Sequence, residues 1–377
     1  MRTPRIALLT LAVALTLPLL GAAPALARSR SAGRGVVFVQ TNEPAGNTID
    51  VFDRGTDGRL TLSGSYPTGG AGGIAGGVAP GDLTDHLGSQ GSLTLTEDGK
   101  TLLAVNAGSD TVTSFRVHDD RLQRRSIVPS GGQFPNSVAA HAGLVYVANA
   151  GGAGDVQGFR LRGGRLVPIP GSDRSLGLGN DDPPNFLTAT GQIGFSPDGS
   201  RLIVTTKLAT NAIDVFNVEK DGTLSNAPVA NPAINPVPFA FTFASGRLVD
   251  AEAATSSLTT YAIDPDGSLS DPRTASDGQG ALCWIAQVGG VFYVSNTVSN
   301  NLSSFTIDAS GQPTLLQAVA AKTDSGPIDL ADSGGYLYAE SGPTGTVDEY
   351  AVNGDGTLTP IGTVTGLPAG MEGIAAT

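Results

Sequence analysis

The fold is decided by the stretch GRLVDAEAATSSLTTYAIDPDG, residues 246–267. It contains an apolar run that ends at Glu252, a short polar turn, a strand that ends near Tyr261, and an Asp-Gly turn. The Asp-Gly pair favours a type I′ hairpin, because both central residues of that turn need positive φ. Another Gly turn precedes the apolar run. One such unit therefore contains two hairpins, which means four short strands.

The same unit recurs seven times along the chain. Its closing aromatic residues are Phe52, Phe115, Phe159, Phe216, Tyr261, Phe305 and Tyr350. Four of the six intervals between them are 44 or 45 residues, the period of a four-stranded propeller blade. The two longer intervals contain that period plus insertions, at 69–91 and 172–192. The sequence thus predicts an all-β, seven-bladed β-propeller, since a tandem of β-sandwiches would not need this period.

The two ends of the repeat region predict how the ring closes. The first repeat starts with the apolar run 36–39, which matches the second strand of a blade and leaves the innermost strand missing. The apolar tail at 371–376 can supply that strand. Pairing strands from both termini removes the open sheet edge. We expect a single domain over 36–377.

Composition and charge exclude several classes of function. The chain of 377 residues has 34 acidic and 22 basic side chains, a formal net charge of −12. An acidic chain without basic runs is not expected to bind nucleic acid or an anionic membrane surface. One Cys excludes an internal disulfide framework, and three scattered His offer no zinc site. We expect no metal, no cofactor and a monomer.

The N-terminus has the pattern of an export signal. Arg2 and Arg5 precede the apolar stretch 6–20, and the small-x-small pattern Ala-Leu-Ala follows at 25–27. This pattern predicts a signal peptide at 1–27 that is cut after Ala27, followed by a flexible leader at 28–35. A retained membrane anchor is the alternative, but the apolar stretch is short and contains a proline. The mature protein is expected to be secreted and free of the membrane.

Candidate catalytic residues lie where the second strand of each blade ends, because propeller ligands bind at a mouth of the channel. These positions include Glu43, Lys207 and Glu252. Converging carboxylates and an amine can form a general base with a cationic stabiliser. The alternative is that these charges are paired or solvated. His86, in the first insertion, is the one His that we consider as catalytic.

Candidate substrate-binding residues are polar or aromatic side chains of the same rim and of the inner strands. Asparagines at the strand ends either steady a developing oxyanion or simply cap the turns. Trp284 either forms a stacking floor for a sugar or lactone ring or packs in the core beside Cys283. The set comprises Gln90, Asn106, Asn149, Gln192, Trp284 and Asn296.

Over 36–377 the chain resembles the seven-bladed propeller lactonase family, which includes 6-phosphogluconolactonases and fungal carboxymuconate cyclases. The residues that carry the resemblance are LGSQGSL at 87–93, AVNAGS at 104–109, GFSPDG at 194–199, PFAF at 238–241, AEA at 251–253 and Cys283-Trp284. They are similar to the secreted bacterial branch of that family.

The chain departs from the family pattern in its fifth blade. Family members often carry an Arg-His pair at the start of that blade, where this chain has Pro238-Phe239-Ala240. The Asn-Glu pair of the matching strand is present only as Ala251-Glu252. Lys207 is the one cation among the rim candidates, so a phosphorylated sugar lactone is a poor candidate substrate.

Two hypotheses of function remain. The resemblance implies a lactonase-like hydrolase, or a cycloisomerase, that acts on a lactone or a carbohydrate-derived cyclic ester. Glu252 or Glu43 would be the base, and Lys207, Asn106 or backbone N–H groups would stabilise the oxyanion. The alternative is a non-catalytic propeller that binds a cell-wall or extracellular partner, since one fold supports many functions.

Overall fold

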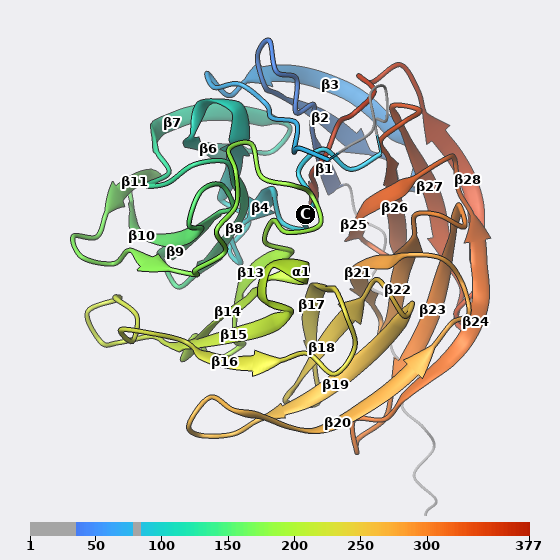
Figure 1. Cartoon of the computed structure of the whole chain (residues 1–377). Coiled ribbons are helices and arrows are strands. Elements are labelled where there is room, and N and C mark those ends of the chain that lie inside the picture. Colours follow the sequence, from blue (N-terminus) through green and yellow to red (C-terminus); the bar gives the residue numbers. More distant parts are fainter. Residues whose placement is uncertain (1–34, 78–83) are drawn as a thin grey trace, which may run out of the picture.

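The computed structural model describes residues 35–77 and 84–377, and they form a ring of seven blades (Figure 1). The predicted signal peptide, and all of the predicted leader except Gly35, lie outside the described residues. Each blade is an antiparallel sheet whose four main strands follow one another from the axis outward, as the repeat predicts. In the described part of the chain, no helix has the length and apolar character that crossing a membrane requires.

The strands of blades 1 to 4 have the following bounds. Blade 1 contains β29 (Ile374–Ala376), β1 (Gly35–Gln40), β2 (Thr48–Arg54) and β3 (Leu60–Pro67). Blade 2 contains β4 (Leu93–Leu95), β5 (Thr101–Asn106), β6 (Thr111–His118) and β7 (Arg121–Pro129). Blade 3 contains β8 (Pro135–His141), β9 (Leu144–Asn149), β10 (Asp155–Arg162) and β11 (Arg165–Pro168), and the short β12 (Arg174–Ser175) also pairs with β10. Blade 4 contains β13 (Gln192–Phe195), β14 (Arg201–Thr205), β15 (Ala212–Asn217) and β16 (Val229–Pro232).

The remaining blades follow the same order. Blade 5 contains β17 (Pro238–Ala244), β18 (Arg247–Glu252), β19 (Ser257–Ile263) and β20 (Leu269–Ser276). Blade 6 contains β21 (Leu282–Val288), β22 (Val291–Asn296), β23 (Asn301–Ile307) and β24 (Pro313–Lys322). Blade 7 contains β25 (Pro327–Ser333), β26 (Tyr336–Ser341), β27 (Thr346–Val352) and β28 (Leu358–Val364). Two short helical turns, η1 (Ala107–Ser109) and α1 (Lys207–Thr210), follow second strands.

The ring closes with strands from both ends of the described chain, as predicted. The tail strand β29 is the innermost strand of blade 1 and pairs antiparallel with β1, with Val37 opposite Ala376 and Val39 opposite Ile374. Ile374 is buried in one apolar cluster with Val37 and Val39. Because this sheet contains residues from both ends, every later blade depends on it for closure.

The predicted turn type is found in a different hairpin from the one expected. In blade 5 the two-residue loop between β17 and β18 has positive φ at both Ser245 and Gly246, as a type I′ turn requires. The Asp266-Gly267 turn between β19 and β20 is longer, and only its glycine has positive φ. There the Asp266 carboxylate accepts a hydrogen bond from the backbone N–H of Ser268 at 3.0 Å. The aspartate therefore stabilises the longer loop through its side chain.

The two insertions lie against each other. A parallel bridge joins Gly76 in the first insertion to Asn185 in the second. The Gly76 N–H donates to the carbonyl of Pro184 at 2.7 Å, and the Phe186 N–H donates back to the carbonyl of Gly76 at 2.9 Å. The described parts of the two insertions are therefore joined to each other, and they lie over one face of the ring (Figure 1).

Closure of the ring makes a stability prediction. Ile374→Ala removes most of a buried side chain from β29, which costs about 2–4 kcal/mol in the free energy of unfolding. Leu62→Ala is the control in the same sheet, because Leu62 on β3 is 56% exposed and its loss changes stability by less than about 0.5 kcal/mol. Urea unfolding followed by circular dichroism measures both. Equal effects of the two substitutions would contradict the role of β29.

Candidate functional site

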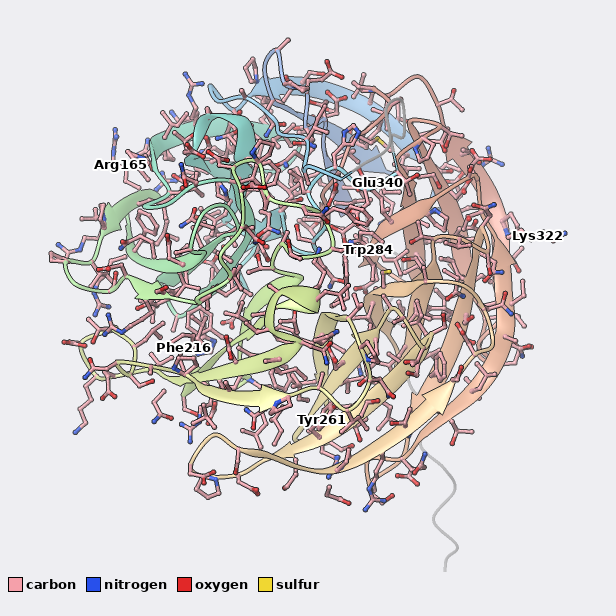
Figure 2. All side chains as sticks on the ribbon, in the orientation of Figure 1. Arg165, Phe216, Tyr261, Trp284, Lys322 and Glu340 are labelled. Carbon is pink, nitrogen blue, oxygen red and sulfur yellow. The ribbon has the colours of Figure 1, made fainter. Side chains whose placement is uncertain are left out.

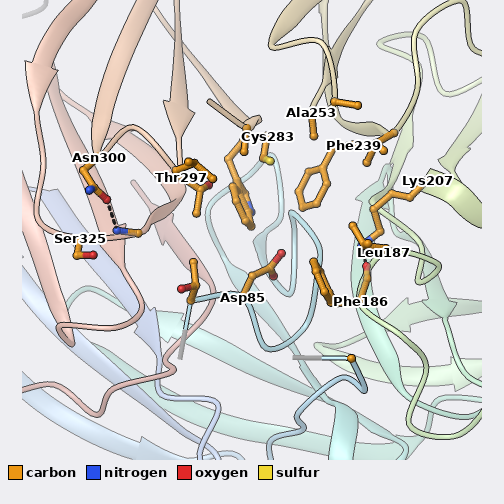
Figure 3. A pocket seen from close by; sticks show the side chains of 18 residues that line it. Asp85, Phe186, Leu187, Lys207, Phe239, Ala253, Cys283, Thr297, Asn300 and Ser325 are labelled. Atoms are coloured by element: carbon orange, nitrogen blue, oxygen red, sulfur yellow. Dashed lines mark hydrogen bonds between the residues drawn. The ribbon is translucent and has the colours of Figure 1, made fainter. Parts of the chain in front are cut away.

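A cavity of about 670 Å³ opens on the face that the two insertions cover (Figure 3). Blades 4 to 7 contribute to its wall together with both insertions. The lining residues are Gly77, Thr84, Asp85, Phe186, Leu187, Lys207, Val237, Phe239, Ala253, Ala254, Ala281, Cys283, Trp284, Thr297, Val298, Asn300, Ser325 and Gly326. Its volume lies in the range of cavities that hold small-molecule ligands.

Lys207 is the cation of this cavity. It is the first residue of α1, two residues after the last residue of β14, and is 1% exposed. Its φ of 42° lies in the left-handed region, which is uncommon for a residue other than glycine and is a feature of functional sites. The ammonium group donates to the carbonyl of Gly88 at 2.5 Å and to the carbonyl of Phe186. An ammonium has three N–H donors, so one is left for a ligand once these two acceptors are counted.

Burial changes the protonation of Lys207. Removal from water lowers its pKa from 10.5 to about 8, although the nearby Asp85 carboxylate opposes this change. The ammonium also lies 5.0 Å from the centre of the Phe239 ring, where the π face favours a cation. At neutral pH the cavity therefore holds a positive charge that a small rise in pH removes.

Asp85 supplies the carboxylate. It belongs to the first insertion, and its Oδ1 accepts a hydrogen bond from the Gly88 N–H at 2.7 Å. Burial raises the pKa of Asp85, while the attraction of Lys207 and this hydrogen bond oppose the rise. Figure 3 shows the Asp85 carboxyl group pointing into the cavity between the aromatic walls. A carboxylate of raised pKa in a cleft, next to a cation, is typical of a general base.

The carboxyl group of Glu372 interacts with that of Asp85. It is fully buried and accepts hydrogen bonds from the backbone N–H groups of Leu87 at 2.7 Å and Ser89 at 3.4 Å. Burial, and then repulsion by Asp85, raises the pKa of Glu372 well above its usual value. Since Lys207 favours the charged form of Asp85, the proton that the two carboxyl groups share belongs mainly to Glu372. Asp85 is thereby kept available as the base.

Two further carboxyl groups lie close to Glu372. Glu340 accepts a hydrogen bond from the Gly373 N–H at 3.0 Å, and Asp329 accepts one from the Leu330 N–H at 2.9 Å. Burial raises the pKa of Asp329 to about 7 and that of Glu340 well above its usual value. Figure 2 shows Glu340 and Trp284 near the middle of the ring, far from peripheral residues such as Arg165 and Lys322. The centre of the ring is therefore acidic, apart from Lys207.

Aromatic side chains form one wall of the cavity. Phe239 on β17 and Trp284 on β21 meet edge to face, with ring centroids 4.7 Å apart. The Trp284 indole N–H donates to the carbonyl of Ser89 at 3.0 Å, which orients the ring. Cys283 lies beside them, and burial raises the pKa of its thiol, so it remains protonated and is a poor nucleophile. The wall is apolar and rigid.

The floor of the cavity is held by one segment, residues 85–92, which we call the plug. It receives contacts from opposite sides of the ring: Lys207 and Trp284 donate to its carbonyls, and Glu372 accepts from its N–H groups. Asn136 of blade 3 also donates to the carbonyl of Leu87 at 3.2 Å. The plug thus connects the base to the cation and to the aromatic wall.

Among the sequence-predicted site residues, Lys207 and Trp284 line the cavity. The predicted convergence of Lys207 with Glu43 and Glu252 is not found, because neither carboxylate is among the described lining residues. Glu43 lies in the turn between β1 and β2, where its carbonyl accepts from the Gly46 N–H.

Glu252 has a structural position that asparagine takes in other blades. It ends β18, and its carboxylate accepts hydrogen bonds from Ser257 and Thr259, five and seven residues further on. In blade 6, the Asn296 amide donates to Asn301 and Ser303, at the same spacing of five and seven residues. Asn235 and Tyr261 also donate to Glu252, so both of its oxygens have partners inside the blade.

The remaining predicted residues likewise make contacts within the fold. Asn106 bonds to Thr111 and Thr113, and Asn149 bonds to Asp155. These two asparagines repeat the strand-end contact of the other blades and do not line the cavity. They correspond to the alternative in which asparagine caps the turn.

Gln90, Gln192 and His86 lie near the axis. The amide of Gln90 bonds to both backbone groups of Ile285 and ties the plug to blade 6. The amide of Gln192 accepts from the Phe241 N–H and ties blade 4 to blade 5. His86, the residue directly after Asp85 in the chain, is 5% exposed and packs against Gly370. None of the three is among the described residues of the cavity wall.

Sequence reasoning missed Asp85 as a candidate base. The residue lies in the first insertion, which has no counterpart in the other repeats, so comparison of repeats could not align it with Lys207. Its signal was the pair Asp85-His86 directly before the motif LGSQGSL at 87–93. The described residues contain no cluster of His, Cys, Asp and Glu that could hold a metal ion.

One protein-family model matches part of the chain. The model of the family described as lactonase, 7-bladed beta-propeller, matches residues 41–162. Together with the seven blades, this match confirms the resemblance to the lactonase propellers that the sequence suggests. No curated protein matches the sequence.

Several solved structures share the fold. A protein from Lactobacillus plantarum is 18% identical, with a TM-score of 0.70 over 91% of this chain and 99% of its own. The periplasmic gluconolactonase of Pseudomonas aeruginosa is 19% identical, also with a TM-score of 0.70 over 91% and 99%. A Bacteroides uniformis protein provisionally named a 6-phosphogluconolactonase is 18% identical, with a TM-score of 0.68 over 91% and 99%. At these identities the likeness establishes the fold alone.

The lowered pKa of Lys207 makes a prediction about stability. Between about pH 8 and 10.5 the unfolded chain binds more protons at this site than the folded protein, so the free energy of unfolding rises with pH. The rise is about 1.4 kcal/mol per pH unit and is absent in Lys207→Met. Urea unfolding of both proteins across this range measures the difference.

The control for this experiment is Lys100→Met, since the Lys100 side chain is 78% exposed. The difference in the free energy of unfolding between Lys100→Met and the wild-type protein should not change with pH over the same range. If the free energies of unfolding of the wild-type protein and Lys207→Met differ by the same amount at every pH, Lys207 has an ordinary pKa and the prediction is wrong.

Proposed function

We propose that this protein is a secreted lactonase that opens a cyclic ester in the cavity, with Asp85 as general base and Lys207 as the oxyanion-stabilising cation. The observation that carries the proposal is the joint placement of a half-buried carboxylate, Asp85, and a buried ammonium, Lys207, on the wall of one cavity. The fold supports it, because the matched family model is that of lactonases. A periplasmic gluconolactonase with the same fold also supports it, since its name assigns that protein to the lactonases.

The proposed reaction needs only groups that the cavity holds. Asp85 takes a proton from water as the water oxygen bonds to the lactone carbonyl carbon, and the free N–H of Lys207 stabilises the resulting oxyanion. The ring C–O bond then breaks, and the protonated Asp85 returns its proton to the leaving alkoxide. The product is a hydroxy acid, and the enzyme regains its starting state. Glu372 and the Gly88 N–H hold Asp85 in place during both transfers.

The first test compares carboxylate variants on a panel of lactones followed by pH-stat. Asp85→Asn should lower kcat/KM by at least about 100-fold, because it removes the general base. Glu43→Gln makes the same change of charge outside the cavity wall and should retain near wild-type activity. If Glu252→Gln abolishes turnover while Asp85→Asn does not, Glu252 is the base. No ring opening by the wild-type protein would favour the non-catalytic binding propeller.

Export is the second part of the proposal, and it is tested separately. The apolar stretch and the Ala-Leu-Ala pattern support cleavage after Ala27. Expression of the full chain in a bacterial host should give a mature protein outside the cytoplasm that begins at Arg28, as intact-mass analysis can determine. Replacing Ala27 with Gln should block cleavage. A wild-type chain that stays whole in the cytoplasm would contradict export.

A further inference from the structure

The wall of the cavity is more apolar than a sugar ligand requires. Ten of the eighteen lining residues have apolar side chains, and six carry a polar group. Phe186, Phe239 and Trp284 provide broad apolar surfaces, and Val237 and Ala253 add smaller ones. Hydrogen-bonding partners for a ring with several hydroxyl groups are therefore scarce.

Most of the polar groups on the wall already have partners. The Thr297 hydroxyl donates to the carbonyl of Pro327 at 3.0 Å, and the Asn300 side-chain oxygen accepts from the Gly326 N–H at 2.8 Å. Lys207 donates to two carbonyls. Few hydrogen-bonding groups of the wall are therefore left for the several hydroxyl groups of a sugar, and a buried polar group without a partner costs binding energy.

The charges on the wall also argue against a phosphorylated ligand. Lys207 is the one cationic side chain among the described lining residues, and Asp85 lies near it. Phosphate recognition favours several donors, above all arginine in bidentate geometry. A dianionic group here would meet one partly neutralised ammonium and the Asp85 carboxylate. The cavity therefore fits a neutral ligand.

Apolar side chains continue from the wall to the surface. Val298 is 74% exposed and Leu187 is 39% exposed, and both line the cavity. Leu208 is 47% exposed, and its N–H bonds to the carbonyl of Leu187. Single exposed apolar residues need no explanation, but a group of them at the mouth of a cavity marks a surface that an apolar ligand covers.

We propose that the ligand is a neutral lactone whose ring carries an unbranched alkyl chain, with the ring between Asp85 and Lys207 and the chain along Phe239 and Trp284 toward Val298. The position of the ring rests on the proposed function. The position of the chain rests on the apolar walls and rim alone, so the two parts can be tested independently.

Trp284 provides the readout for the test. It is the only tryptophan of the chain and lines the cavity, so a ligand that enters changes its fluorescence directly. The titration uses γ-lactones with side chains from methyl to pentyl, and 2-alkylcyclopentanones with the same chains. The ketones have a ring carbonyl but no ester bond, so they report binding without hydrolysis. Glucono-δ-lactone is the polar comparison.

Affinity should rise about fourfold for each added methylene in both series, because each buries one more apolar group. Glucono-δ-lactone should bind more weakly than the pentyl compounds. An affinity that is independent of chain length, or tighter binding of glucono-δ-lactone, overturns the inference. Steep chain-length dependence in the ketones without ring opening of any lactone would refute the proposed catalysis and still support the apolar chain.

A pair of surface variants localises the chain. Val298→Asn should weaken binding of the pentyl compounds at least threefold and leave the methyl compounds unchanged. Val319→Asn is the matched control, since Val319 is 46% exposed on the outer strand β24. Because both side chains are exposed, neither substitution should affect folding. Equal losses for the methyl and pentyl compounds in Val298→Asn would contradict the proposed path.

Discussion

The hydrogen bonds that hold the plug, residues 85–92, are the interaction on which the site depends. A strand ring alone leaves a polar opening along its axis. Here the backbone groups of the plug fill part of that opening and bond to buried side chains from across the ring, among them Lys207, Trp284 and Glu372. Buried polar groups are tolerated only when they are paired in this way. The same bonds orient the base, the cation and the aromatic wall.

This arrangement lowers the stability of the fold, and such a cost is typical of a functional site. An ammonium and several carboxyl groups are removed from water. This lowers the pKa of Lys207 and raises that of Glu372, so both shifts favour the neutral form of the group. Lys207 is also held at positive φ. A structural core of similar volume made only of apolar residues would avoid these costs. The surrounding blades supply the buried apolar area that makes the arrangement possible.

The fold could be predicted from the sequence because each blade repeats the same hairpin signals, and because the apolar tail completes the first blade. The rim was predicted in part, since Lys207 lies just after the second strand of blade 4 and lines the cavity. What repeat comparison could not do was separate a strand-end residue that faces the cavity from one that faces the blade. Glu252 shares its position with Asn296, and only the structure shows that both bond inward.

Asp85 could not be found in that way because an insertion has no periodic neighbours to compare. The sequence likewise gave no sign of the proposed binding path for an alkyl chain. Val298 and Leu187 are unremarkable in sequence and become informative only when the fold places them at one opening.

The most direct test of the account is the pH dependence of kcat/KM for the lactone that the wild-type protein opens fastest. If Asp85 and Lys207 form the catalytic pair, the profile is bell-shaped, and its alkaline limb falls near pH 8, where Lys207 loses its proton. An activity that keeps rising well beyond pH 8, in parallel with hydroxide concentration, would show that the buried ammonium has no part in the reaction.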